Sequence, residues 1–549
     1  MGTMARRWTR LVGLGLRAYL SRRIARLGDA DHWRAHTARI QLAQLRGLLR
    51  SAGGTEFGRA HGFARLATLP DADLLAAYRK ALPPADWYAF KDRIARMREG
   101  AEPDVLWPGL VRDFAQTSGT TAGDKFIPVS REMMRSNFRA SLDIFCHLHR
   151  FGASLPGLTA GRSLFLGGST DFATSDTGIR TGDLSGLVVP MIRWPVSEIY
   201  LPGREIALMS HWPSKLEAMA RACVDRDVRM ISGVPSWTLS LFEKVVALAR
   251  EGGRDARTVA DVWPNLTAFV HGGVRYAPFE PRMREAWSGS PTGPDIPIRH
   301  ELYPASEGFV AMQDTRGDPG LRLMSDVGNF YEFVPLERVN DADAPAHACW
   351  EVEKGRRYVV CMSTCSGLYR YILGDVVEFD TIPAGPDARG GGGPCRLRIV
   401  GRHKHFINAF GENLIVEHVE NAVARAARET GWVVGEFTAA PVYPDPGAGR
   451  RAGLELAIEV RGEVRSHAFA RAFDAALKAQ NVDYTTKRTD DLGMAPPTVT
   501  VLPMGTFERW MASRGKLGGQ HKCPRCANHR DLIDGVVEAG WGSGVGSHG

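Results

Sequence analysis

The chain has 549 residues, of which 44% are hydrophobic and 24% are charged, a composition ordinary for a soluble globular protein with several domains. No apolar run approaches the ~20 residues that cross a bilayer, so we predict no stable membrane insertion. The net charge of +8 does not indicate a nucleic-acid partner, because eleven arginines and two aspartates give residues 1–50 a charge of +9 and leave the rest of the chain at −1.

Residues 1–50 are predicted to form a basic helical arm. The apolar side of its first helix consists of Trp8, Leu11, Leu14, Leu16, Tyr19, Leu20 and Ile24. The simpler interpretation is a helix packed on the protein's own surface, and the alternative is weak contact with an anionic membrane. The apolar stretch 11–20 is short, is broken by Arg17 and precedes no small-residue cleavage site, so we predict no signal peptide.

The eight cysteines are scattered without the spacing of a disulfide framework, which indicates reduced thiols and a cytoplasmic protein. One pair, Cys523 and Cys526, is flanked by His521 and His529. A structural zinc site needs four ligands in closed geometry, whereas the sequence has no second Cys-x-x-Cys and His521 lies only two positions before Cys523. Zinc at this pair is therefore the less favoured interpretation.

The first hundred residues have helical spacing of apolar residues, and strands then alternate with helices. The predicted strands are 163–166, 228–232, 267–271 and 298–302, and the helices between them include 215–225 and 236–249. This alternation predicts an α/β fold with a largely parallel sheet. In such a sheet, ligands bind at the loops beyond the carboxyl ends of the strands.

From about residue 320 the pattern becomes β-rich. The predicted strands are 329–335, 350–353, 357–362, 376–380 and 396–400, the last two joined by a glycine-rich hairpin loop. A helix at 416–429, a strand at 453–461 and a helix at 466–479 predict a compact α+β unit. The predicted divisions are the arm (1–50), a large domain with mixed sheets and a β-rich subdomain (51–400), a smaller C-terminal domain (401–535) and a flexible tail (536–549).

The segment from Thr117 to Lys125 concentrates four hydroxyls, two glycines and a lysine in nine residues, just after a segment at 111–114 that we expect to be buried. Glycines let the backbone approach an anion closely, while amides, hydroxyls and the lysine donate to it. The spacing is not that of a Walker A loop, which ends in Gly-Lys-Ser/Thr. The segment predicts an anion-binding loop, although taken alone a plain turn has a similar composition.

A second polar cluster, from Tyr303 to Gly308, follows the predicted strand 298–302. A carboxylate at a strand end beside a phosphate loop is a natural Mg²⁺ ligand, which points to Glu307. Upstream, Gly272 and Gly273 follow the strand 267–271, and their missing side chains let a planar ring lie against the backbone, with Tyr303 available to stack on it. The alternative is a turn beside a buried tyrosine.

Two further clusters lie near the predicted domain boundary. Asp375 follows a glycine at a strand edge, where its carboxylate can accept hydrogen bonds from two vicinal hydroxyls, although a structural Asx-turn is the alternative. Arg402 belongs to a basic Gly-Arg-His-Lys sequence at the boundary itself. Near the C-terminus, the stretch 505–525 carries several basic residues, among them Lys516 and Lys522, and in isolation would be a solvated charged face.

Together these motifs resemble the acyl-adenylate-forming (firefly luciferase-like) superfamily and, within it, the auxin-responsive GH3 (Gretchen Hagen) family of acyl acid amido synthetases. The first family motif, Ser/Thr-Ser-Gly-Thr-Ser/Thr-x-Gly, is matched by residues 117–123, and the second, Tyr-x-x-Ser-Glu, by residues 303–307. Segments that also look like the family are 55–59, 233–237, 331–333, 505–507 and 520–522. The resemblance covers about residues 40 to 530.

The resemblance implies an enzyme that uses ATP and Mg²⁺ to join a small carboxylic acid to an amine, usually an amino acid, through an acyl adenylate. The implied ATP- and AMP-binding residues are Thr117, Ser118, Gly119, Thr120, Thr121, Gly123, Lys125, Gly272, Gly273, Tyr303, Ser306, Asp375 and Arg402. Glu307 would hold Mg²⁺, and Lys522, or alternatively Lys516, would reach the α-phosphate from a mobile C-terminal domain. Suggested walls of an acyl pocket are Phe138, Val234 and Trp237.

One family motif is incomplete. Tyr-Arg-x-Gly-Asp reads here as Tyr-Ile-Leu-Gly-Asp, with Ile372 in place of the arginine. Arg370 precedes Tyr371 and would lie on the opposite face of a strand, so it is not an obvious substitute. Two rivals therefore remain: a ligase that transfers the acyl group to coenzyme A, and a non-catalytic protein that binds acyl acids. The sequence favours neither a monomer nor a homodimer.

Overall fold

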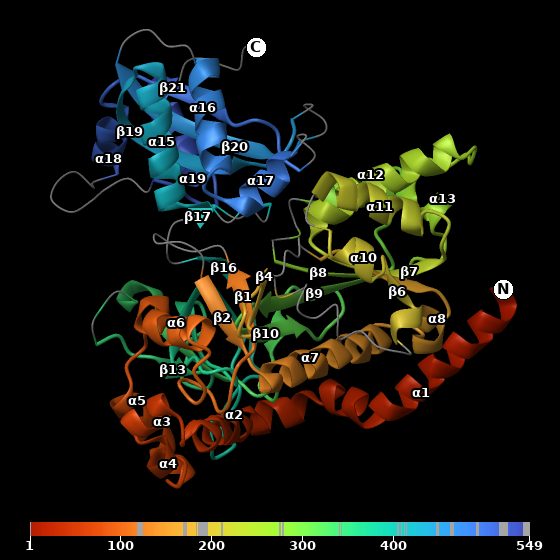
Figure 1. Ribbon diagram of the computed structural model, residues 1–549, viewed down its shortest axis with the longest axis vertical. Coiled ribbons are helices and arrows are strands. Elements are labelled where there is room, and N and C mark those ends of the chain that lie inside the picture. Colours follow the sequence, from red (N-terminus) through yellow and green to blue (C-terminus); the bar gives the residue numbers. More distant parts are fainter. Residues whose placement is uncertain are drawn as a thin grey trace.

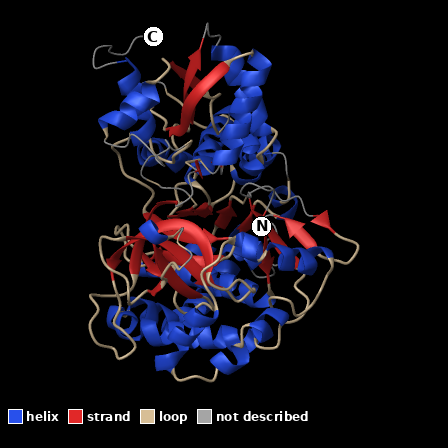
Figure 2. Cartoon of the chain, turned by 90° about the vertical axis from the view of Figure 1, so that its left-hand side faces the viewer, coloured by secondary structure: helices blue, strands red, loops and turns tan. Residues whose placement is uncertain are grey.

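The computed structural model describes residues 2–117, 125–167, 173–182, 184, 196–209, 212–273, 276, 279–339, 341, 343–402, 406–407, 409–410, 412, 414–445, 450–461, 466–489, 493–514 and 525–541. The protein consists of a large body built around a central sheet and a separate C-terminal unit (Figure 1). Figure 2 shows both parts from a second side, with strands at the centre of each. The predicted α/β class with a smaller α+β unit is confirmed.

Within the described residues, one sheet of twelve strands runs through the large body in the order β13-β12-β14-β15-β16-β11-β10-β9-β8-β7-β3-β6. The strands are β3 (Arg162–Phe165), β6 (Tyr200–Leu201), β7 (Val228–Ser232), β8 (Ala268–Gly272), β9 (Ile298–Ala305), β10 (Gly308–Gln313), β11 (Leu321–Leu323), β12 (Phe330–Pro335), β13 (His347–Ala348), β14 (Arg357–Ser363), β15 (Tyr371–Thr381) and β16 (Arg396–Arg402). From β6 to β9 neighbours pair in parallel, and from β9 to β13 they pair antiparallel. The predicted parallel and β-rich regions are thus two halves of one sheet.

Helices cover both faces of the parallel half, as its apolar strands require. These helices are α7 (Arg131–Arg150), α8 (Leu155–Thr159), α10 (Arg204–Ala207), α11 (Trp212–Cys223), α12 (Pro235–Glu251), α13 (Val259–Val262) and α14 (Glu280–Ser288). Ile231 and Phe269 pack in a cluster with α11 and α12, whereas their neighbours Met230 and Ala268 pack in another with α7. Successive side chains of a strand point to opposite faces, so each strand contributes to both cores.

The N-terminal helices lie along the outer side of the large body (Figure 1). They are α1 (Gly2–Gly28), α2 (Ala30–Ala52), α3 (Glu56–Ala60), α4 (Phe63–Leu66), α5 (Asp71–Ala81) and α6 (Lys91–Glu99), with a 3-10 turn at Trp87–Ala89 before α6. Asp29 separates α1 from α2 by capping α2, since its side chain accepts a hydrogen bond from the backbone N–H of His32. Among the described residues, none of these or later helices has the length and apolar content of a membrane span.

The predicted single apolar side of α1 is wrong: its apolar residues fall on two faces. Leu20 is buried and Leu16 and Ile24 are partly buried against the cluster that contains α7 and α8. Trp8 and Leu11, with two further residues treated below, face solvent instead. The reason is spacing, because at about 100° per residue positions 16, 20 and 24 lie opposite the exposed ones.

A small sheet of strands β2-β1-β5-β4 lies apart from the large one. Its strands are β1 (Asp113–Thr117), β2 (Lys125–Val129), β4 (Ala173–Thr174) and β5 (Arg180–Gly182). Of the segment predicted to be buried, Val111 and Phe114 are buried, whereas Arg112 is exposed. Ala115, the next residue on β1, is fully buried. The hairpin β1–β2 therefore presents its connecting loop from a rigid base.

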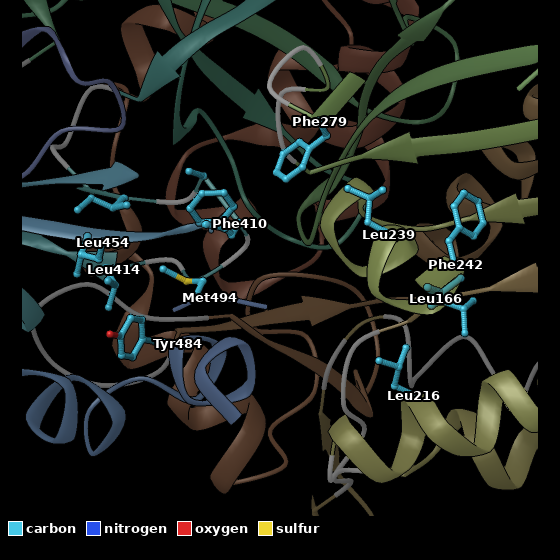
Figure 3. Close-up of a cluster of buried hydrophobic side chains, with 14 of the residues drawn as sticks. Leu166, Leu216, Leu239, Phe242, Phe279, Phe410, Leu414, Leu454, Tyr484 and Met494 are labelled. Carbon is cyan, nitrogen blue, oxygen red and sulfur yellow. The ribbon is translucent and has the colours of Figure 1, made fainter. Parts of the chain in front are cut away.

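The C-terminal unit has a three-stranded sheet covered by helices. Its elements are the short strands β17 (Phe406–Ile407) and β18 (Leu414–Ile415), then α15 (Val416–Thr430), β19 (Val433–Val442), β20 (Gly453–Arg461), α16 (Ser466–Lys478), α17 (Val482–Arg488), β21 (Thr498–Leu502), α18 (Thr506–Ser513) and α19 (Asp531–Trp541). An apolar cluster continues from this unit into the large body: Figure 3 shows Phe410, Leu414 and Tyr484 on one side and Leu239 and Phe279 on the other.

Two segments differ from the sequence prediction. Residues 350–353 form a turn rather than a strand, because the backbone N–H of Glu351 bonds to the carbonyl of Ala348 and its side chain accepts from the Ala348 N–H. The predicted tail also begins too early: α19 extends to Trp541, and Val536 is fully buried beside Trp510. The glycine-rich hairpin between β15 and β16 is confirmed, with Thr381 paired to Arg396.

Candidate active site

The hairpin β1–β2 holds the two ends of the predicted anion-binding loop. Thr117 and Lys125 are paired directly across the hairpin, so the loop leaves and returns at one point. Lys125 is half-buried at that point. The loop residues themselves lie outside the described residues, namely Ser118, Gly119, Thr120, Thr121 and Gly123. The structure thus describes the two ends of the loop, Thr117 and Lys125, and not the residues between them.

Ser366 ties this hairpin to the strand that carries Asp375. Its hydroxyl donates to the carbonyl of Pro128 on β2 (2.6 Å) and accepts from the backbone N–H of Ser130 (2.7 Å), and it is fully buried. Leu373, two residues before Asp375, packs against both the cluster containing β1 and the cluster containing Tyr303. Sequence analysis missed Ser366, because a lone serine in a loop carries no distinguishing signal.

Tyr303 and Asp375 are in direct contact. The Tyr303 hydroxyl donates a hydrogen bond of 2.6 Å to Oδ2 of Asp375, and both residues are buried. β9 and β15 are four strand spacings apart in the sheet order, about 19 Å if the sheet were flat. The contact therefore requires the antiparallel half to curl, with Tyr303, Val377 and Leu397 in the apolar cluster inside the curl.

Glu307 lies in the two-residue turn where the sheet changes from parallel to antiparallel. Ser306 and Glu307 connect β9 to β10, with Ala305 paired to Gly308, and the Glu307 residue is largely buried. The space behind the turn is tight: a Cβ at Gly308, whose φ is +147°, would lie 2.6 Å from Nδ2 of Asn329 and 3.6 Å from Sδ of Met133. Because Met133 follows β2 in the first turn of α7, the turn adjoins the hairpin.

Gly272 and Gly273 lie at the carboxyl end of β8, as predicted. A Cβ at Gly272 would lie 2.4 Å from the carbonyl oxygen of Leu302, the residue before Tyr303. Gly273 has a φ of +82°, and a Cβ there would be 3.7 Å from Cγ2 of Val234 at the start of α12. The glycines, Val234 and Tyr303 therefore meet at one edge of the sheet, the edge where ligands bind in α/β proteins.

The other predicted residues are placed less closely together. Arg402 pairs with Asp375 in the β15–β16 register. Phe138 is on α7 with 63% of its surface exposed, and Trp237 lies one turn beyond Val234 with Nζ of Lys487, from the C-terminal unit, 3.8 Å from its ring centroid. Lys522 and Lys516 lie outside the described residues.

Arg370 does not replace the missing motif arginine. It is buried and forms an ion pair with Glu332, 2.8 Å between Nε and Oε2, while Nη1 donates to the carbonyl of Leu82 at 2.5 Å. Its φ of +48° turns the chain just before β15. Arg370 is therefore a structural residue, and removing one partner of such a buried pair typically costs about 3–5 kcal/mol of stability.

Glu307 is the carboxylate that the site offers to a metal ion. Within the described part of the chain, no group of three or more His, Cys, Asp and Glu side chains is arranged to hold a metal ion. Cys526 is buried beside Ala439, and burial raises the pKa of its thiol to about 12, which disfavours a thiolate ligand. A single carboxylate fits Mg²⁺, which is typically held by one or two carboxylates plus phosphate oxygens.

Comparison with solved structures identifies the fold. AtGH3.15 acyl acid amido synthetase, solved in complex with 2,4-DB, is similar with a TM-score of 0.56 at 16% identity, covering 94% of this chain and 95% of that one. A 2-hydroxyisobutyryl-CoA ligase solved with 2-HIB-AMP and CoA is similar with a TM-score of 0.50 at 14% identity, covering 91% of each chain. The chain shares its fold with these two proteins.

Sequence comparison gives the family. The chain matches the GH3 family N-terminal domain over residues 26–198, the GH3 family central domain over 322–385 and the GH3 family C-terminal domain over 417–531. Indole-3-acetic acid-amido synthetase GH3.10 of Arabidopsis thaliana is 23% identical, covering 92% of this chain and 95% of that one. Jasmonoyl-L-amino acid synthetase JAR4 of Nicotiana attenuata is 22% identical, covering 62% and 66%. The chain belongs to the GH3 family, which confirms the resemblance.

Proposed function

We propose that this protein is an ATP-dependent acyl acid amido synthetase. It activates a carboxylic acid as an acyl adenylate and passes the acyl group to an amine, with an amino acid as the expected acceptor. The observation that supports this most is the meeting of Tyr303, Asp375, the two glycines and the Glu307 turn beside the base of the hydroxyl-rich loop. Family membership supports the same reaction type.

In the first half-reaction a carboxylate oxygen of the acid attacks the α-phosphorus of ATP, and the bond to the bridging oxygen breaks to release pyrophosphate. The loop from Thr117 to Lys125 holds the phosphates. Glu307 would hold Mg²⁺, which would supply positive charge to the phosphate oxygens. The Asp375 carboxylate, which is hydrogen-bonded to Tyr303, accepts hydrogen bonds from the ribose hydroxyls. Arg402 is paired with Asp375 on the neighbouring strand. The adenine lies against Gly272 and Gly273.

In the second half-reaction the amine nitrogen attacks the acyl carbon, the bond to the phosphate oxygen breaks, and AMP leaves as the nitrogen loses a proton. Superfamily enzymes rotate the small domain between the two steps, and closure excludes water that would hydrolyse the adenylate. The present interface includes Lys487 over Trp237. A cation–π contact of about 0.5–2 kcal/mol does not prevent such a rotation.

The direct test is to supply the purified chain with ATP, a panel of aromatic and aliphatic acids, and either amino acids or coenzyme A. The expected products are an amide, AMP and pyrophosphate in equal amounts, identified by mass. A thioester formed instead of an amide would show a coenzyme A ligase, which the similar CoA ligase fold makes the natural rival. Acid binding without pyrophosphate release from any acid would show a non-catalytic protein.

Tyr303→Phe tests the ribose contact. Without the Tyr303 hydroxyl, the Asp375 carboxylate loses a hydrogen-bond donor that positions it. We therefore expect the KM for ATP to rise about tenfold, which corresponds to the loss of one hydrogen bond to a charged group. Tyr369→Phe is the matched control, since Tyr369 is also buried and loses a hydrogen bond of 2.8 Å to the carbonyl of Leu106. Equal KM values for both variants would contradict the positioning role of Tyr303.

A further inference from the structure

The outer face of α1 is apolar although the helix is well packed on its inner face. Trp8, Leu11, Leu14 and Tyr19 are 46%, 58%, 50% and 75% exposed, and they are four of the nine exposed large hydrophobic residues in the described part of the chain. At about 100° per residue the four lie within an arc of about 140°. Such a concentration on one helix marks an interaction surface rather than the single exposed apolar residues that are normal.

The exposed surface of α1 is also strongly basic: Arg22 lies within the apolar arc, and Arg10 and Arg17 lie about 40° and 60° beyond one edge of it. Arg10, Arg17 and Arg22 are exposed, and α1 contains no acidic residue. Among the described side chains, none forms an ion pair with these three arginines, whereas the partly buried Arg23, about 40° beyond the opposite edge of the arc, bonds to Asp143 at 2.7 Å. The arm accounts for the excess positive charge of the whole chain.

The helix is held firmly in place. A Cβ at Gly13 would lie 2.6 Å from Cα of Pro156 on α8, so the two backbones touch. Leu20 and Leu27 are buried in the same contact region. Together with the Arg23 ion pairs, these contacts present the outer face as a fixed surface at the edge of the molecule, as α1 lies in Figure 1.

We propose that the outer face of α1 docks the protein on a membrane surface that contains anionic lipids. An interfacial helix places apolar and aromatic residues among the lipid headgroups and basic residues against lipid phosphates, and Trp8 and Tyr19 are the aromatic types found at that depth. Arginine suits phosphate recognition. A second copy of the chain is a poorer occupant, because a symmetric contact through this face would set arginines against arginines.

The test is sedimentation of the full chain with vesicles of phosphatidylcholine alone or with one third phosphatidylglycerol. Binding is expected only to the anionic vesicles. It is expected to fall at 1 M salt, where charges are screened within about 3 Å. Arg10→Gln with Arg17→Gln should weaken binding about fivefold per arginine. Equal binding to both vesicles, or to neither, would overturn the proposal.

A second variant separates the membrane from other occupants. Leu11→Ser with Leu14→Ser should abolish vesicle binding and leave amide synthesis and the melting temperature unchanged, because both side chains face away from the core. The matched controls are Val482→Ser for the apolar change and Arg257→Gln with Arg389→Gln for the charge change, all exposed and all on elements other than α1. A wild-type dimer that becomes monomeric in Leu11→Ser, Leu14→Ser without vesicle binding would assign the face to self-association and overturn the proposal.

Discussion

Glu307→Ala is expected to abolish acid-dependent exchange of pyrophosphate into ATP, with a loss of at least about 10²–10³-fold, the cost of removing one preorganised electrostatic group. Glu307 is the carboxylate at the β9–β10 turn, on the side of the sheet where Met133, which follows β2, lies behind the turn. Without this carboxylate, a Mg²⁺ ion bound with ATP would lose the protein ligand that we propose, and the charge of the transition state would be less well neutralised. Exchange of labelled pyrophosphate isolates the first half-reaction.

Two comparisons make this result specific. Glu301→Gln changes a carboxylate on the same strand, about 15–20 Å along the chain from the turn, and should leave exchange near normal. Raising Mg²⁺ or substituting Mn²⁺ should partly restore Glu307→Gln, which keeps the size of the side chain. Near-normal exchange by Glu307→Ala at low Mg²⁺ would remove the metal role from this residue.

The strands and helices of the parallel half could be predicted because each is encoded locally. β7 has the predicted bounds. β9 begins at the predicted residue, Ile298, and ends three residues later than predicted, at Ala305. Local encoding likewise explains β20 in the C-terminal unit, where apolar residues at every second position (454, 456, 458 and 460) define a strand. The strand predicted at 350–353 is wrong because the apolar residues there are buried or partly buried although they lie in a turn that Glu351 stabilises. Periodicity cannot distinguish such a turn from so short a strand.

The site could be predicted as residue types but not as geometry. Tyr303 and Asp375 are 72 positions apart, and their contact depends on curling of the sheet, which no local pattern encodes. Ser366, which bonds to the hairpin, and Asn329, whose side-chain amide lies close to Gly308 after the Glu307 turn, carry no motif of their own. Only the fold shows where they lie.

The apolar residues were the least predictable part of the site. Trp237 was a candidate wall of the acyl pocket, yet its ring lies beside Lys487 of the C-terminal unit. Phe138 is largely exposed. The outer residues of α1 are large and apolar like its inner residues, and the sequence pattern predicted both sets on one face. Apolar side chains serve cores, interfaces and pockets alike, so the sequence alone does not assign them.

Lys522→Ala is expected to slow adenylation by about 10²–10³-fold while ATP affinity stays within about threefold. A lysine that reaches the α-phosphate only after the small domain closes stabilises the transition state more than bound ATP, so kcat should fall and the dissociation constant should not. Pyrophosphate exchange gives the first quantity and equilibrium binding of ATP gives the second. Amide formation from a supplied acyl adenylate should be affected far less.

Lys516→Ala is the matched control, because both lysines lie in the stretch 505–525 and compete for the same role. If the larger loss of exchange moves to Lys516→Ala, that residue is the mobile-domain lysine and the assignment of Lys522 is wrong. If Lys522→Ala loses ATP affinity instead of rate, the lysine acts before closure, as a structural or ground-state contact. Comparing the loss of exchange rate with the loss of ATP affinity in Lys522→Ala therefore decides whether domain closure brings a cation from the C-terminal unit to the α-phosphate.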